Sequence, residues 1–222
     1  MKLVLKFGGT SLSSPKDIRH VAKTISSLAK NNEIVVVCSA VDGVTDDLIQ
    51  ISRMVEHRKK NDVAETLNKI IKKHTQFANQ TIKNSTIKKQ LLEKLNTDVS
   101  ELQELVRGLT LLKEVSVRSL DYLISFGERL SDDLVSYAIQ DLKKESTALN
   151  GKEVGIVTDS NFGESRPLMD TTRIRISKTL GSLLSKKVIP VVGGFAGADQ
   201  HGNITTFGRG GSDYTATIIA SC

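Results

Sequence analysis

The stretch GGFAGADQHGNITTFGRGGSDYT, residues 193–215, decides how the rest of the chain is interpreted. The apolar run VIPVV at 188–192 precedes it and predicts a buried parallel strand that ends in a glycine turn. The polar residues 199–203 predict a hairpin tip, and residues 204–207 its return strand. This part of the chain therefore indicates a strand, a hairpin and then a glycine-rich loop.

In that loop, GRGG at 208–211, three glycines surround Arg209. Ser212 and Asp213 follow, and we expect them to cap a helix that runs to the end of the chain. Glycines let backbone N–H groups approach an oxyanion closely. The N-terminus of the helix adds the positive end of the helix dipole, which attracts an anion. The loop favours a carboxylate or phosphate ligand, although a short GRGG alone would indicate only a turn.

A second glycine turn lies near the N-terminus. LVLKF at 3–7 predicts a short buried strand, and GGTS at 8–11 follows it, with Lys6 at the strand tip. Ser14 and Pro15 then predict the start of a helix. The turn resembles a phosphate cradle but lacks the spacing of a Walker A loop, and simple turn chemistry remains the alternative.

The second buried strand is predicted at 34–38, and Ser39 lies just past its end. In an open α/β sheet, ligands bind beyond the carboxyl ends of the strands. We therefore expect Lys6, the diglycine turn and Ser39 to share one rim of the sheet. Further strands are predicted at 154–157 and 188–192, with a helix at 170–186 between them. This alternation predicts parallel crossovers with helices on both faces.

Residues 56–118 show helical periodicity only and predict an all-helical insertion. The 14 basic and 8 acidic residues of the slightly longer segment 53–118 account for the net charge of +6, and its lysines alternate with leucines and isoleucines as on a solvated helix face. Aromatic residues, which stack on bases, make up only 4% of the chain. These features argue against nucleic-acid binding. We expect no chemistry from His74.

A further helix is predicted from Ser119, interrupted near Gly127 and then resumed. Gly127 indicates close approach by a ligand or a neighbouring backbone. Glu128 could bind a substrate ammonium group, but a solvated pair with Arg129 explains its position equally well. The sequence alone leaves both interpretations open.

No apolar segment approaches the length of a membrane span, and the N-terminus has no signal-peptide core. The two cysteines and four histidines form neither a disulfide framework nor a metal-ligand pattern. We therefore expect a cytoplasmic protein with no protein-held metal and no membrane or nucleic-acid partner.

Four motifs together resemble the aspartate kinases of the amino-acid kinase superfamily: KFGGTS at 6–11, SAVDGVT at 39–45, SFGERLS at 125–131 and TTFGRGGSDYTA at 205–216. The resemblance implies a three-layer α/β/α sandwich with a mainly parallel central sheet and the helical insertion at about 56–118. It implies phosphoryl transfer from Mg-ATP to the β-carboxylate of L-aspartate, giving 4-phospho-L-aspartate, the first step toward lysine, threonine and methionine. The cofactors implied are ATP and Mg²⁺.

The resemblance also implies roles for individual residues, and Lys6 and Asp213 would be catalytic. The ATP phosphates would be bound by Lys6, Phe7, Gly8, Gly9, Thr10, Ser11, Gly210 and Gly211. The substrate aspartate would be bound by Ser39, Thr45, Glu128, Arg209 and Ser212.

Three alternatives stay open: a superfamily kinase for glutamate, N-acetylglutamate, carbamate or UMP; a non-catalytic amino-acid-binding module; and a basic nucleic-acid binder. The family's nucleotide-side segment and its regulatory ACT domains are not found within residues 1–222. We therefore expect a catalytic domain truncated on its nucleotide side. We expect this chain alone to be inactive and to form a homo-oligomer.

Overall fold

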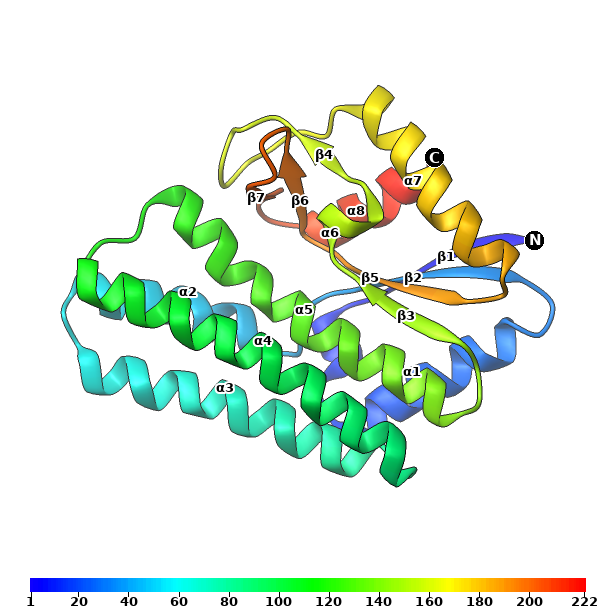
Figure 1. The fold of residues 1–222 in the computed structure, drawn as a ribbon, viewed down its shortest axis with the longest axis horizontal. Helices are drawn as coiled ribbons and strands as arrows, with labels where there is room; N and C mark the ends of the chain where they lie inside the picture. The colour runs from blue at the N-terminus through cyan, green and yellow to red at the C-terminus, as the bar shows by residue number, and fades with distance from the viewer.

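Four parallel strands form the central sheet of the computed structural model, which describes all 222 residues (Figure 1). In sheet order they are β1 (Lys2–Phe7), β2 (Glu33–Cys38), β5 (Ile189–Gly193) and β3 (Ser146–Leu149). The register pairs Phe7 with Cys38 and Cys38 with Gly193, so β1, β2 and β5 end at one edge. This edge carries the candidate site.

Each face of the sheet is covered by helices. Along β2, Ile34, Val36 and Cys38 belong to one buried cluster, whereas Val35 and Val37 belong to another. This alternation of side chains between the two faces is what a strand buried on both sides requires. The predicted three-layer α/β/α class is therefore confirmed.

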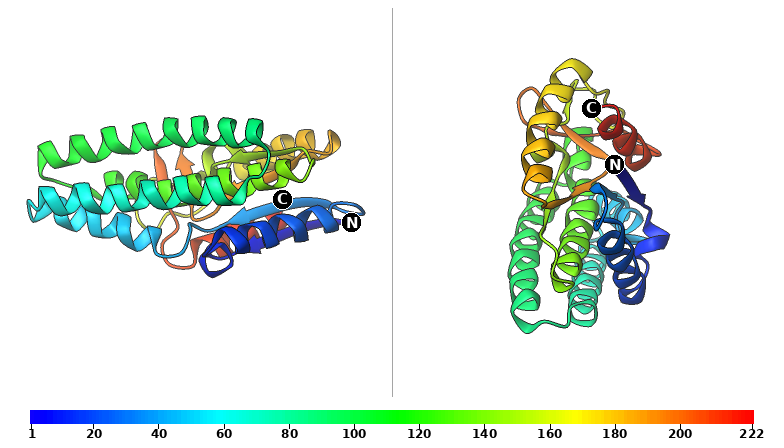
Figure 2. Two further views of the ribbon diagram at one scale, coloured as in Figure 1. Left: turned by 90° about the horizontal axis from the view of Figure 1, so that it is seen from below. Right: turned by 90° about the vertical axis from the view of Figure 1, so that its right-hand side faces the viewer.

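The larger cluster joins the sheet to five helices: α1 (Pro15–Leu28), α2 (Val44–Glu56), α3 (Lys60–Thr81), α4 (Ser85–Leu112) and α5 (Val117–Asp141). Figures 1 and 2 show α3 and α4 running alongside each other and extending beyond the sheet. The smaller cluster lies under α7 (Met169–Ser185) and α8 (Gly211–Ala220). No helix of the structure combines the length and apolar character needed to cross a lipid bilayer.

A second sheet holds β4 (Val157–Thr158), β6 (Ala196–Asp199) and β7 (Ile204–Thr206), in that order. β6 and β7 are antiparallel, which confirms the hairpin predicted around residues 199–203. The carboxylate of Asp199 accepts hydrogen bonds from the backbone N–H groups of His201 and Asn203, and so holds the hairpin tip.

The strand predicted at 154–157 is wrong. Val154 ends the short helix α6 (Gly151–Val154), whose capping box joins Asn150 and Glu153. Gly155 then ends this helix with a φ of 105°, and the strand starts only at Val157. The local capping contacts outweigh the β propensity of the apolar residues. The strand β3, which precedes this helix, was not predicted from the sequence.

The predicted interruption of the helix near Gly127 is also wrong, because α5 is continuous. A Cβ atom on Gly127 would lie 2.9 Å from the Cβ of Ala40, in the loop after β2. Gly127 therefore serves close packing of α5 against this loop, not a break in the helix.

Candidate active site

An ion pair joins the two glycine loops. The Nζ atom of Lys6, at the end of β1, lies 2.8 Å from Oδ1 of Asp213, in the first turn of α8. The predicted cap is wrong: α8 begins at Gly211 with Gly210 as its N-cap, and no side chain caps it. Gly210 has a φ of 79°, so the loop turns sharply enough to direct Asp213 toward β1.

The diglycine turn lies beside this ion pair. Gly8 is the N-cap of the short 3₁₀ helix η1 (Gly9–Leu12), and a Cβ atom on Gly8 would lie 3.5 Å from Nζ of Lys6. The carbonyl of Phe7 accepts a hydrogen bond of 3.0 Å from the N–H of Ser39. The loops after β1 and β2 are thus held together, while Thr10 and Ser11 remain exposed.

Glu128 lies buried on α5, next to the loop that follows β2. Its Oε1 accepts a hydrogen bond of 3.1 Å from the N–H of Ala40, while its Oε2 has no partner. Burial raises the pKa of Glu128 to about 8. Arg129 pairs instead with Asp98 at 2.5 Å and Glu101 at 2.8 Å, so the interpretation of a solvated Glu128–Arg129 pair is wrong.

The other predicted substrate ligands lie around Glu128 and Gly194. The Oγ1 atom of Thr45 would lie 3.6 Å from a Cβ atom on Gly127, next to Glu128. Ser212 is buried, and a Cβ atom on Gly194 would lie 2.7 Å from its Cβ. Arg209 is exposed and forms no ion pair within the chain, so its guanidinium remains available to a ligand.

A cavity of about 960 Å³ opens beside α5, between the α4–α5 pair and the segment containing α6 and β6. Its lining includes Glu128, Asp132, Gly193 and Gly194, but neither Lys6 nor Arg209. Of the predicted site residues, Glu128 alone lines the cavity. The Lys6–Asp213 pair lies outside it.

Asp132 was missed by the sequence analysis. It follows Glu128 by one helical turn, is 1% exposed and lines the same cavity. Burial and nearby carboxylates raise its pKa well above the usual range. Its position four residues after Glu128, which places both carboxyls on one face of the helix, was the signal that could have identified it.

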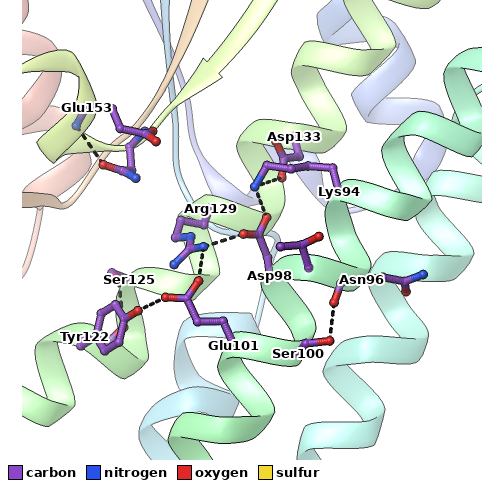
Figure 3. Close-up of polar contacts among 12 residues, drawn as sticks. Lys94, Asn96, Asp98, Ser100, Glu101, Tyr122, Ser125, Arg129, Asp133 and Glu153 are labelled. Carbon is purple, nitrogen blue, oxygen red and sulfur yellow. Dashed lines mark hydrogen bonds and ion pairs between the residues drawn. The ribbon is translucent and has the colours of Figure 1, made fainter.

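A network of charged side chains joins α4 to α5 beside the cavity (Figure 3). Arg129 contacts Asp98 and Glu101, Tyr122 donates a hydrogen bond to Glu101, and Lys94 lies 2.6 Å from Asp98. Within this network, the cations Lys94 and Arg129 are paired with carboxylates of α4.

The chain belongs to the amino acid kinase family, whose sequence model matches residues 1–222. Among curated relatives it is similar to aspartokinase 2, chloroplastic, of Arabidopsis thaliana, with 31% identity over 97% of this chain and 39% of that protein. It is also 29% identical to the aspartokinase of Geobacillus stearothermophilus, over 99% of this chain and 39% of that protein.

Among solved structures, the chain resembles E. coli aspartokinase III in complex with aspartate and ADP. The TM-score is 0.87 and the sequence identity 25%, over 99% of this chain and 46% of that one. This chain thus spans less than half the length of these relatives, and the likeness extends over nearly all of its own fold.

Proposed function

We propose that the chain carries the substrate-binding part of an aspartate kinase, which transfers the γ-phosphoryl group of ATP to the β-carboxylate of L-aspartate. The observation that carries this proposal is the ion pair of Lys6 with Asp213, which brings the two glycine loops to one edge of the sheet. The similarity to aspartokinases supports aspartate as the acceptor, and the ADP bound to aspartokinase III supports ATP as the donor.

The proposed reaction needs no basic residue to activate the acceptor, because the β-carboxylate is already ionised near neutral pH. A carboxylate oxygen attacks the γ-phosphorus, the bond from that phosphorus to the bridging oxygen breaks, and ADP leaves. Lys6 would neutralise the transferring group, with the N–H groups of Gly8 and Gly9 beside it. Asp213 would orient Lys6, to which it is already bound.

The phosphates would be bound by the two glycine loops, that is, by Lys6, Phe7, Gly8, Gly9, Thr10, Ser11, Gly210 and Gly211. The exposed guanidinium of Arg209 would bind the α-carboxylate through a planar two-point contact. Glu128 would accept a hydrogen bond from the α-ammonium group through its Oε2 atom, which has no partner within the chain. Ser39, Thr45 and Ser212 would complete the substrate contacts.

Mg²⁺ is proposed to enter on the phosphates of ATP, because the chain has no group of three or more histidine, cysteine, aspartate or glutamate side chains able to hold a metal. No step is assigned to the ion. We further propose that the protein is cytoplasmic and forms a homo-oligomer; sedimentation of the purified protein would test the oligomeric state.

The test of this function is a substrate panel with the complete protein and Mg-ATP. Hydroxylamine traps acyl phosphates, so hydroxamate formation should require L-aspartate and should be absent with glutamate or N-acetylglutamate. Conversion of UMP, or of glutamate in preference to aspartate, would instead favour another reaction of the same family.

A further inference from the structure

Two acidic side chains on the cavity floor are paired by no basic residue. Glu128 is 5% and Asp132 1% exposed, and each has one side-chain oxygen without a partner: Oε2 of Glu128 and Oδ1 of Asp132. Neither carboxyl forms a salt bridge with a lysine, arginine or histidine. Because buried carboxyls without partners are costly, a cation from outside the chain that satisfied them would be bound favourably.

The two carboxyls share one corner of the cavity. They lie four residues apart on α5 and so project from the same face of the helix. A Cβ atom on Gly193 would lie 2.4 Å from Oδ2 of Asp132 and 3.4 Å from Cβ of Glu128. The missing side chain at Gly193, at the end of β5, is what leaves room for this corner.

The neighbouring charges that shift the pKa of Asp132 are carboxylates. Besides burial, carboxylates on α4, α5 and α6 raise its pKa; they belong to Asp133, Glu128, Glu153 and Asp98. Lys94 and Arg129 are held by carboxylates of the α4–α5 network, and the other basic residues of the cavity lining, Arg118 and Lys152, form no salt bridge with either carboxyl. This corner is therefore suited to a positively charged ligand.

An ammonium group fits the corner better than a metal ion. Hard divalent cations take six or more oxygen ligands, and no third acidic or histidine ligand joins these two carboxyls in a metal-binding group. A substrate ammonium has three N–H donors, which exceed what the single free oxygen of Glu128 can accept.

We propose that Asp132 is a second ligand of the substrate's α-ammonium, which it shares with Glu128. This inference rests on the proposed function and adds a specificity-determining residue to it. With two acceptors for the ammonium, the site selects an amino acid over a dicarboxylate of the same length that lacks the amino group. Asp132 touches the substrate only at its amino end, away from the carboxylate that is phosphorylated.

The experiment compares L-aspartate with succinate, which has both carboxylates and no ammonium. The dissociation constant for aspartate and the inhibition constant for succinate are measured in the complete protein for wild type, Asp132→Asn and Asp132→Ala. A lost hydrogen bond to a charged group corresponds to about 10-fold or more, so Asp132→Ala should weaken aspartate by that factor. Succinate should bind unchanged or more tightly, and kcat should change less than the affinity for aspartate.

Asp133→Asn is the matched control. Asp133 also has a raised pKa and an oxygen without a partner, but it neighbours Lys94 and is not part of the cavity lining. We expect this variant to keep the wild-type ratio of aspartate to succinate affinity. Because the ratio is taken within one variant, partial unfolding changes both ligands alike and leaves it unaltered.

If Asp132→Ala changed both affinities equally or neither, while the wild type phosphorylated aspartate, Asp132 would not be a ligand and the proposed function would stand. A requirement for potassium or free ammonium ions that disappears in Asp132→Ala would assign the corner to an inorganic cation and overturn the inference. A wild type that phosphorylates no aspartate would refute the proposed function itself.

Discussion

Lys6 and Asp213 form the contact on which the proposed chemistry depends. Lys6 is partly exposed and Asp213 largely exposed, so the pair is accessible to a nucleotide. A surface pair of this kind contributes little to stability. We therefore expect the loss of this ion pair to lower the activity and to leave the free energy of unfolding almost unchanged.

In Lys6→Ala, the phosphoryl group loses its charge-stabilising contact, and kcat should fall by roughly 10²–10³. Hydroxylamine trapping of the acyl phosphate in the complete protein measures this change. The control is Lys2→Ala, an exposed lysine on the same strand, which should keep wild-type activity. Activity of Lys6→Ala within a few-fold of wild type would remove Lys6 from the mechanism.

At the scale of elements, the contact between α4 and α5 positions the helix that carries Glu128. Asp98 on α4 is nearly fully buried and is held by Arg129 and Lys94 (Figure 3). The guanidinium of Arg129 also lies 4.5 Å from the centre of the Phe126 ring. Since α5 packs against β3 and β5 as well, this network links α4 to the edge of the sheet that bears the site.

Arg129→Met leaves Asp98 and Glu101 without their common partner. Breaking a buried pair costs about 3–5 kcal/mol, and we expect the lower end because Lys94 still holds Asp98. Urea unfolding measures the loss. Lys89→Met breaks an exposed pair with Glu93 on α4 and should change the free energy of unfolding by less than about 1 kcal/mol. Equal effects of the two substitutions would mean that the network contributes no more than a surface pair.

For the whole molecule, buried carboxyls make stability depend on pH. The pKa of Glu128 is raised from 4.5 to about 8 and that of Asp133 from 3.8 to about 7. The folded state thus keeps protons that the unfolded state releases, and the free energy of unfolding falls as pH rises through this range. The buried His74, with its pKa lowered from 6.5 to about 4, has the opposite effect between those two values. Above about pH 6.5, His74 no longer changes the slope, and the pH dependence of stability reflects the buried carboxyls.

Between about pH 6.5 and pH 8 we expect stability to decrease with rising pH, and Glu128→Gln to show a smaller decrease. Urea titrations at several pH values measure both. His20→Gln, a change at an exposed histidine, is the control and should keep the wild-type slope. A flat wild-type curve, or the same slope in Glu128→Gln, would contradict the assignment of a raised pKa to this carboxyl.

The strongest local patterns were correctly predicted from the sequence. The apolar runs produced β1, β2 and β5, the polar tip at 199–203 produced a hairpin, and the periodicity at 170–186 produced α7. Contacts within a few residues of one another decide such features, and the sequence displays them directly. The prediction failed at 154–157, where a capping box competes with β propensity, and at Gly127, whose neighbour Ala40 is distant in sequence.

By itself the sequence determined the family, the α/β class and the loops on which candidate residues lie, because glycine turns and apolar runs are local signals. Only the tertiary structure decided which of these residues meet. It placed Asp213 on Lys6, turned Arg129 away from Glu128 and buried Asp132 beside Gly193. These contacts join residues far apart in the chain. They depend on the sheet register and on the packing of α5 and α8, which no local pattern specifies.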